Sequence, residues 1–239
     1  MTLLATGAFL VAERLVPGRA LPASPGWYAR ALLVNFAQLA ITLATGKVVW
    51  PLLFAGGSLL SLAGWEAPAL EGFIAYFVGT FVFYWWHRIR HLPGFWRVFH
   101  QVHHSPSRIE ILTSFYKHPI EIVVNSLISG ALLYPILGCS MLGTFWYNFF
   151  AATGEYFYHG NLRTPGWLRF FVQTPELHSI HHQLDVHAFN YSDLPVWDRL
   201  FGTYRDAREF APRCGFHGDS ERRLGEMLLF RDVNRQQAA

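Results

Sequence analysis

Charged residues are scarce in this chain of 239 residues. Asp, Glu, Lys and Arg together make up 15% of it, against roughly 25% in soluble domains. Hydrophobic residues reach 52% and aromatic residues 17%. A chain with so little charge has too few polar side chains to face water on every side, so the composition favours a protein embedded in a bilayer. The length suits one compact domain.

Cysteines and basic runs are also nearly absent. Cys139 lies in an apolar stretch and Cys214 in a polar one, so we expect two free thiols and no disulfide framework. The net charge of +3 comes from residues that flank apolar segments, which excludes a nucleic-acid surface and is typical of cytoplasmic juxtamembrane loops. A signal peptide would carry positive charge before its apolar core, and none precedes residues 3–12, so we expect this stretch to be retained as a short membrane segment.

Apolar stretches occupy residues 3–12, 31–62, 69–86, 120–138 and 141–158. The second is too long for one straight span of about 20 residues, and Pro51 and Gly56-Gly57 predict a kink or break within it. The third ends in aromatic residues, as spans do at the membrane interface. The last two predict a membrane hairpin that returns to the side on which it began.

The expected fold is therefore all-α: an integral membrane helical bundle of about four to five membrane segments, with a cytoplasmic helical cap. The polar, basic stretch 87–119 places this side in the cytoplasm by the positive-inside rule. We expect one domain, with N-terminal membrane segments in residues 1–69, a catalytic core in 70–206 and a cytoplasmic tail in 207–239.

Histidines form three clusters with helical spacing. They are H-R-I-R-H (His87, His91), H-Q-V-H-H (His100, His103, His104) and H-S-I-H-H (His178, His181, His182). Residues three or four apart lie on one face of a helix. A single pair of this kind is more often a satisfied polar face than a ligand set. Eight imidazoles in three clusters are more than one metal needs, and imidazole suits iron, zinc, copper and nickel, so we expect two metal ions.

His159 follows the last apolar stretch, where it becomes a ninth candidate ligand. Glu155 precedes it by one helical turn and is a candidate ligand, a carboxylate that orients a ligand, or a buried acid. His118 and His187 are candidate ligands or outer contacts, with polar interface residues as the alternative. His217 is expected to be solvated.

Three carboxylates are candidates to fix the tautomers of the ligating imidazoles: Glu121, Glu155 and Asp185. Asp198, in the sequence W-D-R, is expected to have a structural role and to pair with Arg199 or Arg205.

Residues 70 to 206 resemble the fatty acid hydroxylase superfamily, also called the sterol desaturase family. The resemblance includes the three histidine clusters in order, K-H-P-I-E, H-G-N-L-R-T-P-G and the ending W-D-R-L-F-G-T. It implies a helical membrane protein with a cytosol-facing di-metal centre, O₂ as oxidant and a lipid substrate. The ligand positions that it implies are His87, His91, His100, His103, His104, His159, His178, His181 and His182.

Glu155 stands where fatty acid 2-hydroxylase-like members have a further histidine, which moves the chain toward other, bacterial-type members. The resemblance implies two iron ions, with zinc as a substitute metal, and a location in the bacterial inner membrane. The expected reaction is the hydroxylation or desaturation of a lipid C–H bond, with the lipid entering from the bilayer. The chain has no H-P-G-G heme motif, so we expect electrons from a separate donor of the cytochrome or ferredoxin type, and no nucleic-acid partner.

Two other functions fit a histidine-rich membrane protein. A zinc-dependent membrane hydrolase would be favoured by an H-E-x-x-H helix, which the sequence lacks. A metal transporter or sensor would place ionisable ligands within the spans, whereas these histidines follow their ends. The lipid itself stays open among sterols, hopanoids, carotenoids, fatty acyl chains, ornithine lipids and alkylglycerol ethers.

Overall fold

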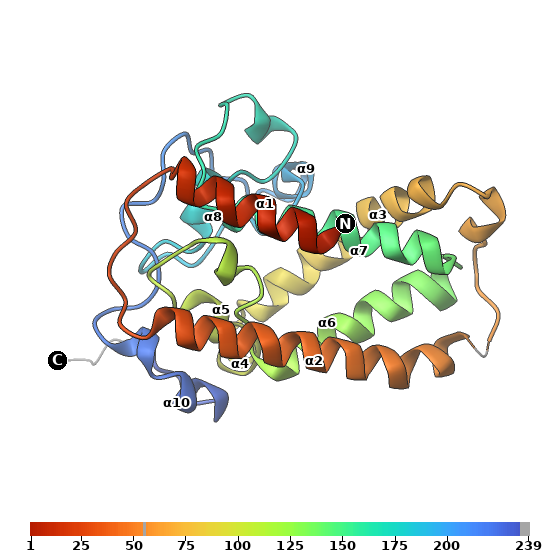
Figure 1. Ribbon diagram of the computed structural model, residues 1–239, viewed down its shortest axis with the longest axis horizontal. Coiled ribbons are helices and arrows are strands. Elements are labelled where there is room, and N and C mark those ends of the chain that lie inside the picture. The colour runs from red at the N-terminus through yellow and green to blue at the C-terminus, as the bar shows by residue number, and fades with distance from the viewer. Residues whose placement is uncertain (55, 235–239) are drawn as a thin grey trace.

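The computed structural model describes residues 1–54 and 56–234, and within these ranges the chain folds into helices and loops without a β-strand (Figure 1). Gln183 and Cys214 form an isolated β-bridge, and both cysteines are buried free thiols, as expected. The predicted all-α fold is confirmed. Residue 55 of the long apolar stretch and the last five residues of the predicted tail lie outside the described residues.

Five long helices form the body of the molecule. They are α1 (Thr2–Leu15), α2 (Trp27–Phe54), α3 (Pro68–Arg90), α6 (Pro119–Ala131, continued by a π-helical turn at Leu132–Ile136) and α7 (Met141–His159). Short helices build the other end: α4 (Pro93–Phe95), a π-helical turn (Trp96–His100), α5 (Gln101–His104), α8 (Pro175–His181), α9 (Pro195–Leu200) and α10 (Leu224–Leu228). Single 3-10 turns occupy Leu62–Trp65, Ile111–Thr113, Leu168–Phe170 and Ser220–Arg222.

Three of the described helices are long and apolar enough to cross a membrane: Trp27–Val48 of α2, Pro68–Arg90 and Pro119–Ile136. Helices α1 and α7 form the other two expected membrane segments but do not reach this combination of length and hydropathy. Helix α2 is continuous over 28 residues, so the interruption expected within residues 31–62 comes only after Phe54.

Small residues let two of the long helices pack closely. Helix α3 lies on α7 and α2 lies on α6, while α1 covers α7 (Figure 1). A Cβ added to Gly72 would lie 2.3 Å from Trp146 Cβ, and one added to Gly143 would meet the Glu71 side chain. Glu71 accepts hydrogen bonds of 2.9 Å from the backbone N–H and the hydroxyl of Ser140, the residue that caps α7. Helices α3 and α7 are thereby held in a fixed register.

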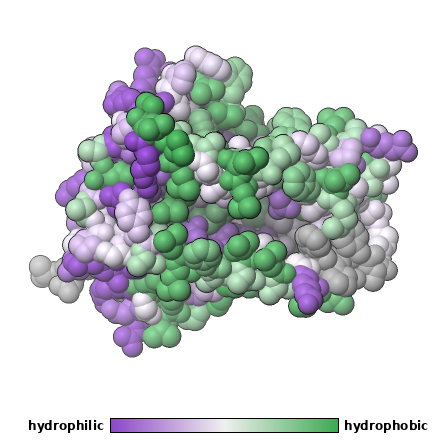
Figure 2. All heavy atoms as spheres, viewed as in Figure 1, coloured by the Kyte–Doolittle hydropathy of each residue, from purple (hydrophilic) through white to green (hydrophobic). Residues whose placement is uncertain are grey.

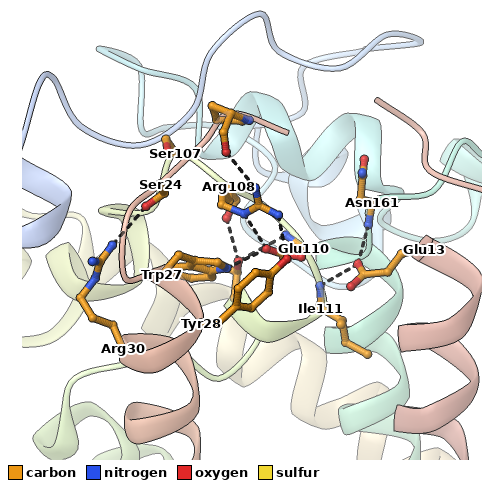
Figure 3. Close-up of polar contacts among 12 residues, drawn as sticks. Glu13, Ser24, Trp27, Tyr28, Arg30, Ser107, Arg108, Glu110, Ile111 and Asn161 are labelled. Carbon is orange, nitrogen blue, oxygen red and sulfur yellow. Dashed lines mark hydrogen bonds and ion pairs between the residues drawn. The ribbon is translucent and has the colours of Figure 1, made fainter. Parts of the chain in front are cut away.

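A buried polar network fixes the N-terminal helices to the loop after α5 (Figure 3). Glu13 of α1 accepts hydrogen bonds from the backbone N–H groups of Ile111 and Asn161, at 3.0 and 3.2 Å. Glu110 accepts from Trp27 Nε1 at 2.6 Å and from Arg108 Nε at 2.8 Å. Burying an unpaired carboxylate is costly, so these partners make the position of the loop specific. This loop begins directly after the H-Q-V-H-H cluster.

Candidate metal centre

All nine histidines that the sequence singled out meet at one end of the helical bundle, in two groups. The first group contains His87, His91, His100, His104 and His181, and the second contains His103, His159, His178 and His182. Within each group, one ring nitrogen from every residue lies within 4.8 Å of the others. Each group could hold one metal ion.

The two H-x-x-H-H clusters each divide between the groups. On an α-helix, residues four apart point about 40° from each other, whereas adjacent residues point about 100° apart. His100 and His104 accordingly share the first group, while His103 turns to the second. In α8 the assignment is reversed, because His178 and His182 share the second group and His181 joins the first. One H-x-x-H-H cluster therefore serves two metal positions.

Ring nitrogens in the second group converge at short distances. His159 Nε2 lies 3.2 Å from His103 Nε2 and 3.0 Å from His178 Nε2, and His182 Nε2 lies 3.1 Å from His178 Nε2. Nitrogen ligands sit about 2.0–2.1 Å from a metal such as zinc, so neighbouring ligands around one ion are roughly 3 Å apart. The observed spacing is that of a coordination shell.

The first group contains nitrogen atoms without protein partners. His87 Nε2 and His100 Nε2 lie 2.8 Å apart. The buried Nε2 atoms of His91, His104 and His181 have no hydrogen-bond partner among the described residues. An unsatisfied buried polar atom costs about 1–3 kcal/mol, so three in one cluster are explained most simply by a ligand that they hold in common. The residues present fit a metal ion.

Backbone carbonyls from one segment orient two ligands of the first group. His181 Nδ1–H donates to the Phe189 carbonyl at 2.7 Å, and His87 Nδ1–H donates to the Tyr191 carbonyl at 2.6 Å. With the proton on Nδ1, the lone pair of Nε2 is free for a metal. Phe189 and Asn190 both have positive φ, and the Asn190 carbonyl between the two accepts instead from the Gln173 side chain at 2.6 Å.

The W-D-R-L-F-G-T sequence holds that segment in place. Asp198 is fully buried and accepts from the backbone N–H groups of Tyr191 and Ser192 and from the Thr203 hydroxyl, at 2.7–2.9 Å. Asp198 is structural, as expected, but these groups take the place of the predicted arginine partners. Backbone amides satisfy a buried carboxylate because the tight turn brings them within reach. Asn190 completes the turn through Leu177 and Arg205.

Burial keeps the imidazoles neutral. It lowers the pKa of His91, His100, His103, His104, His178 and His182 well below the usual range, and that of His181 to about 3. Close neighbouring imidazoles lower the pKa of His104 and His182 further, because two positive charges side by side repel. A neutral imidazole is the form that binds a metal, so the site is ready to take one at neutral pH.

Two of the three predicted carboxylates adjoin the histidines. Glu121 forms a buried ion pair with Arg90 and accepts from His100 Nδ1, with its nearer oxygen 3.3 Å away. Glu155 forms a 2.8 Å ion pair with Lys117, and its backbone carbonyl accepts from His159 Nδ1 at 2.8 Å. The Glu155 carboxylate lies outside the two groups of converging ligand atoms.

The remaining candidates lie around the site or away from it. Asp185 is at the exposed surface, where it bonds His217 Nε2 at 2.8 Å, and His217 is exposed as expected. His118 caps α6 by accepting from the Ile120 N–H, and it belongs to neither group. His187 adjoins the first group, with its Nδ1 3.2 Å from Nδ1 of His104.

An open polar cavity of about 340 Å³ leads to the first group. Its lining residues are His91, Trp96, Asp185, Val186, His187 and Asn234. The Trp96 ring lies 5.3 Å from the ring of His91 and 5.2 Å from that of His104. Sequence reasoning missed Trp96, Arg90 and Lys117, because a ring or cation beside a histidine has no spacing of its own. The position of Arg90 inside H-R-I-R-H was the available signal.

Several known proteins are similar in sequence to this chain. Sphinganine C4-monooxygenase 2 of Arabidopsis thaliana is 32% identical over 128 residues, which cover 51% of this chain and 49% of that protein. Methylsterol monooxygenase 2-2 of the same plant is 30% identical over 188 residues, 75% of this chain and 68% of that protein. Alkylglycerol monooxygenase of Xenopus tropicalis is 26% identical over 150 residues, 61% of this chain and 32% of that protein.

The chain spans about half the length of the sphinganine monooxygenases that it matches. No solved structure matches it. The family model for fatty acid hydroxylases matches residues 72–203, a range that contains both histidine groups and the Asp198 turn. With this match over more than half of its length, the chain belongs to the fatty acid hydroxylase family.

Proposed function

We propose that this protein is a membrane-bound, non-heme di-iron enzyme that uses O₂ to oxidise a C–H bond of a lipid. The observation that carries the proposal is the pair of histidine groups, whose nine neutral imidazoles converge on two positions next to membrane helices. The names of its relatives support it, since they are monooxygenases of sphinganine, methylsterols and alkylglycerols. Electrons come from a separate donor, and the outcome is hydroxylation or desaturation.

The nine histidines are the proposed metal ligands. When bound, iron would supply the one-electron and O₂ chemistry that amino-acid side chains lack. The protein's own part is to hold Nε2 atoms free of protons, through Nδ1–H bonds to the Phe189, Tyr191 and Glu155 carbonyls. Glu121 does the same for His100 and is held by Arg90. We assign Glu121 and Glu155 as positioning residues.

The position of the groups matches a lipid substrate. His87 lies in the last turn of α3 and His159 is the last residue of α7, so the proposed centre sits where the bundle meets its polar end. Figure 2 shows the same division, with hydrophilic residues gathered at the end that holds α8 and α10 and hydrophobic residues along the long helices. A lipid that stays in the bilayer can bring its chain to this boundary. We place this end on the cytoplasmic side.

Metal analysis joined to lipid analysis tests the proposal. Purified full-length protein should contain about two irons per chain, one for each group. Membranes of cells that express it should contain an oxidised lipid, found by comparative mass spectrometry, that is missing from cells expressing His104→Ala. A protein with stoichiometric zinc alone that acts on lipids without O₂ would establish the hydrolase alternative. Movement of iron across the membrane of vesicles that contain the protein, without lipid oxidation, would establish the transporter alternative.

A further inference from the structure

Large apolar side chains are exposed around α9 and the neighbouring 3-10 turn. We call these residues the apolar lip: Trp167, Phe170, Phe171, Val196 and Leu200, which are 61%, 50%, 68%, 47% and 66% exposed. Helix α9 packs against the 3-10 turn, so the lip residues come from two adjacent segments. Exposed apolar clusters of this kind mark a surface that binds a partner or a membrane.

The apolar lip continues the lipid-facing surface of α3. Phe73, Phe77, Phe81 and Trp85 follow one another at intervals of four residues and are all exposed, which makes a stripe along this candidate span. Trp197 of α9 packs on Phe77 and Phe81, with ring centroids 5.4 and 5.0 Å apart. Phe201 packs on Trp85 at 4.8 Å. Helix α9 therefore lies beside the helix at the level of Phe77 to Trp85, before the turn that carries His87.

Arginines border the apolar lip in an arrangement suited to lipid headgroups. The guanidinium group of the exposed Arg199 lies 5.2 Å from the centre of the Phe170 ring, whereas the guanidinium group of Arg169, 4.4 Å from the same ring, is buried and paired with Asp206. The Arg205 guanidinium lies 5.2 Å from the Phe189 ring. Arginine at a membrane interface extends its charge to phosphate groups while its stem and neighbouring rings stay in apolar surroundings. The mixture of aromatic and basic residues matches an interfacial segment.

We infer that the apolar lip is embedded in the bilayer leaflet that surrounds the C-terminal turns of α3, and that its partner is lipid. This places α9 and the 3-10 turn at Leu168–Phe170 in the membrane interface instead of the cytoplasmic cap expected from the sequence. Continuity with the α3 stripe selects lipid over a protein partner, since a protein docked here would also have to cover a membrane-facing helix. The two exposed arginines, Arg199 and Arg205, favour anionic headgroups.

The lip is connected to the histidines through a short stretch of chain. The segment that carries the Phe189 and Tyr191 carbonyls leads directly into α9, and Asp198 of α9 holds the Tyr191 and Ser192 amides. Val196 and Leu200, the lip residues of α9, are therefore separated by only one turn of chain from the carbonyls that orient His87 and His181. The bilayer forms part of the support of the first histidine group.

Depth measurements with spin labels test this inference without any assay of turnover. Phe171→Cys and Leu200→Cys would each be labelled with a nitroxide in the full-length protein. The protein would be placed in nanodiscs of phosphatidylcholine and phosphatidylglycerol. Phe73→Cys, on the exposed stripe of α3, serves as the membrane reference, and Asp219→Cys, at an exposed polar surface, as the water reference. Both native cysteines are buried, and labelling of the unsubstituted protein gives the background.

Collision rates with O₂, which concentrates in lipid, and with a water-soluble nickel chelate give the depth of each label. Labels at positions 171 and 200 should show an O₂-to-nickel ratio close to that at 73 and several-fold above that at 219. Ratios equal to that at 219 would overturn the inference. Low O₂ and low nickel collision rates together would also overturn it, because they indicate a protein or a second copy of this chain covering the lip. Metal content measured on each variant shows that its fold is retained.

Discussion

The two histidine groups differ in what surrounds them. The first has five histidines, borders the open cavity through His91 and receives its orientation from the 189–191 segment and Glu121. The second has four, all buried, and its neighbours are the Lys117–Glu155 ion pair and Tyr158. Both draw on the same two H-x-x-H-H clusters.

One repeated motif, H-x-x-H-H, therefore contributes to two candidate metal sites that differ in the number of histidines and in their surroundings. One helical turn before His159, this chain places Glu155, an acid paired with Lys117. The second group therefore has an ion pair close to His159. We expect a metal ion held by the first group to exchange faster than one held by the second, because the polar cavity opens onto the first group.

The largest effect should come from removing one ligand from either group. His104→Ala and His182→Ala each delete a buried imidazole from one group only. We expect both variants to lose lipid oxidation by more than about a hundredfold, since the proposed chemistry needs both metals. Iron should fall from about two to about one per chain, with the remaining ion in the untouched group.

The control for these variants is His217→Ala, which removes an exposed histidine outside both groups. It should keep full iron content, full activity and the same membrane insertion as the unsubstituted protein. Retained turnover in His104→Ala or His182→Ala would remove that residue from the ligand set. Loss of both irons from a single substitution would show that the two positions load as one unit.

Changing the carboxylates beside the histidines should have a smaller effect, which is confined to one group at a time. Glu155→Gln and Lys117→Met break the ion pair beside the second group, whereas Glu121→Gln breaks the contacts beside the first. Losing such an outer partner typically weakens metal binding by about 10–100-fold. Iron titration should show one weakened site in each variant. An equal weakening of both sites by Glu155→Gln would mean that its carboxylate is shared between them.

Much of this arrangement could be predicted from sequence because the spacing of residues on a helix is fixed. The division of eight histidines into helical clusters follows from that periodicity, and the apolar runs gave the approximate positions of the long helices, although α2 ends at Phe54, before the end of its apolar stretch. The departures concern contacts between distant segments. The Nδ1 partners of His87 and His181 are backbone carbonyls at positions 191 and 189, and a carbonyl has no signature in a sequence.

The positions of the charged side chains also depend on contacts between distant segments. Asp185 was a candidate to fix the tautomer of an imidazole, yet the chain turns there with positive φ and carries the side chain to the surface. Arg90, for which the sequence predicted no role, is buried against Glu121. The pairing of Arg90 depends on how α3 packs beside α6, and single-sequence patterns do not contain that information.

The stability of the protein should depend on pH through Asp193, a buried carboxylate near the second group. Burial raises the pKa of Asp193 to about 7, and the nearby Glu155 charge adds to this. Its carboxylate accepts from the hydroxyls of Tyr76 and Tyr158, at 3.3 and 3.2 Å. Because the folded pKa exceeds the unfolded value of about 3.9, the folded protein binds the extra proton between these values. Stability should therefore fall as pH rises from about 4 to 7, by at most about 1.4 kcal/mol per unit.

Asp193→Asn should remove this contribution, since asparagine stays neutral and keeps the shape of the side chain. Thermal unfolding in detergent at several pH values, with and without the substitution, gives the difference between the two slopes. Asp206→Asn is the matched control, because Asp206 is exposed and its pKa is lowered: its slight burial acts upward, but hydrogen bonds from Tyr204 and Arg169 outweigh it. Parallel curves for the Asp193 variant and the unsubstituted protein would contradict the expectation.

The smallest effect should come from Asp185→Asn, on the rim of the cavity beside the first group. Asp185 and His217 are about half exposed, and an ion pair in water contributes about 0–1 kcal/mol. Iron content and turnover should stay within about twofold of the unsubstituted protein. A tenfold loss of turnover with unchanged iron would instead connect Asp185 to the first group through His187, which lines the same cavity and lies against His104. The two groups would then differ in access to solvent as well as in ligand number, with the cavity rim acting on one of them alone.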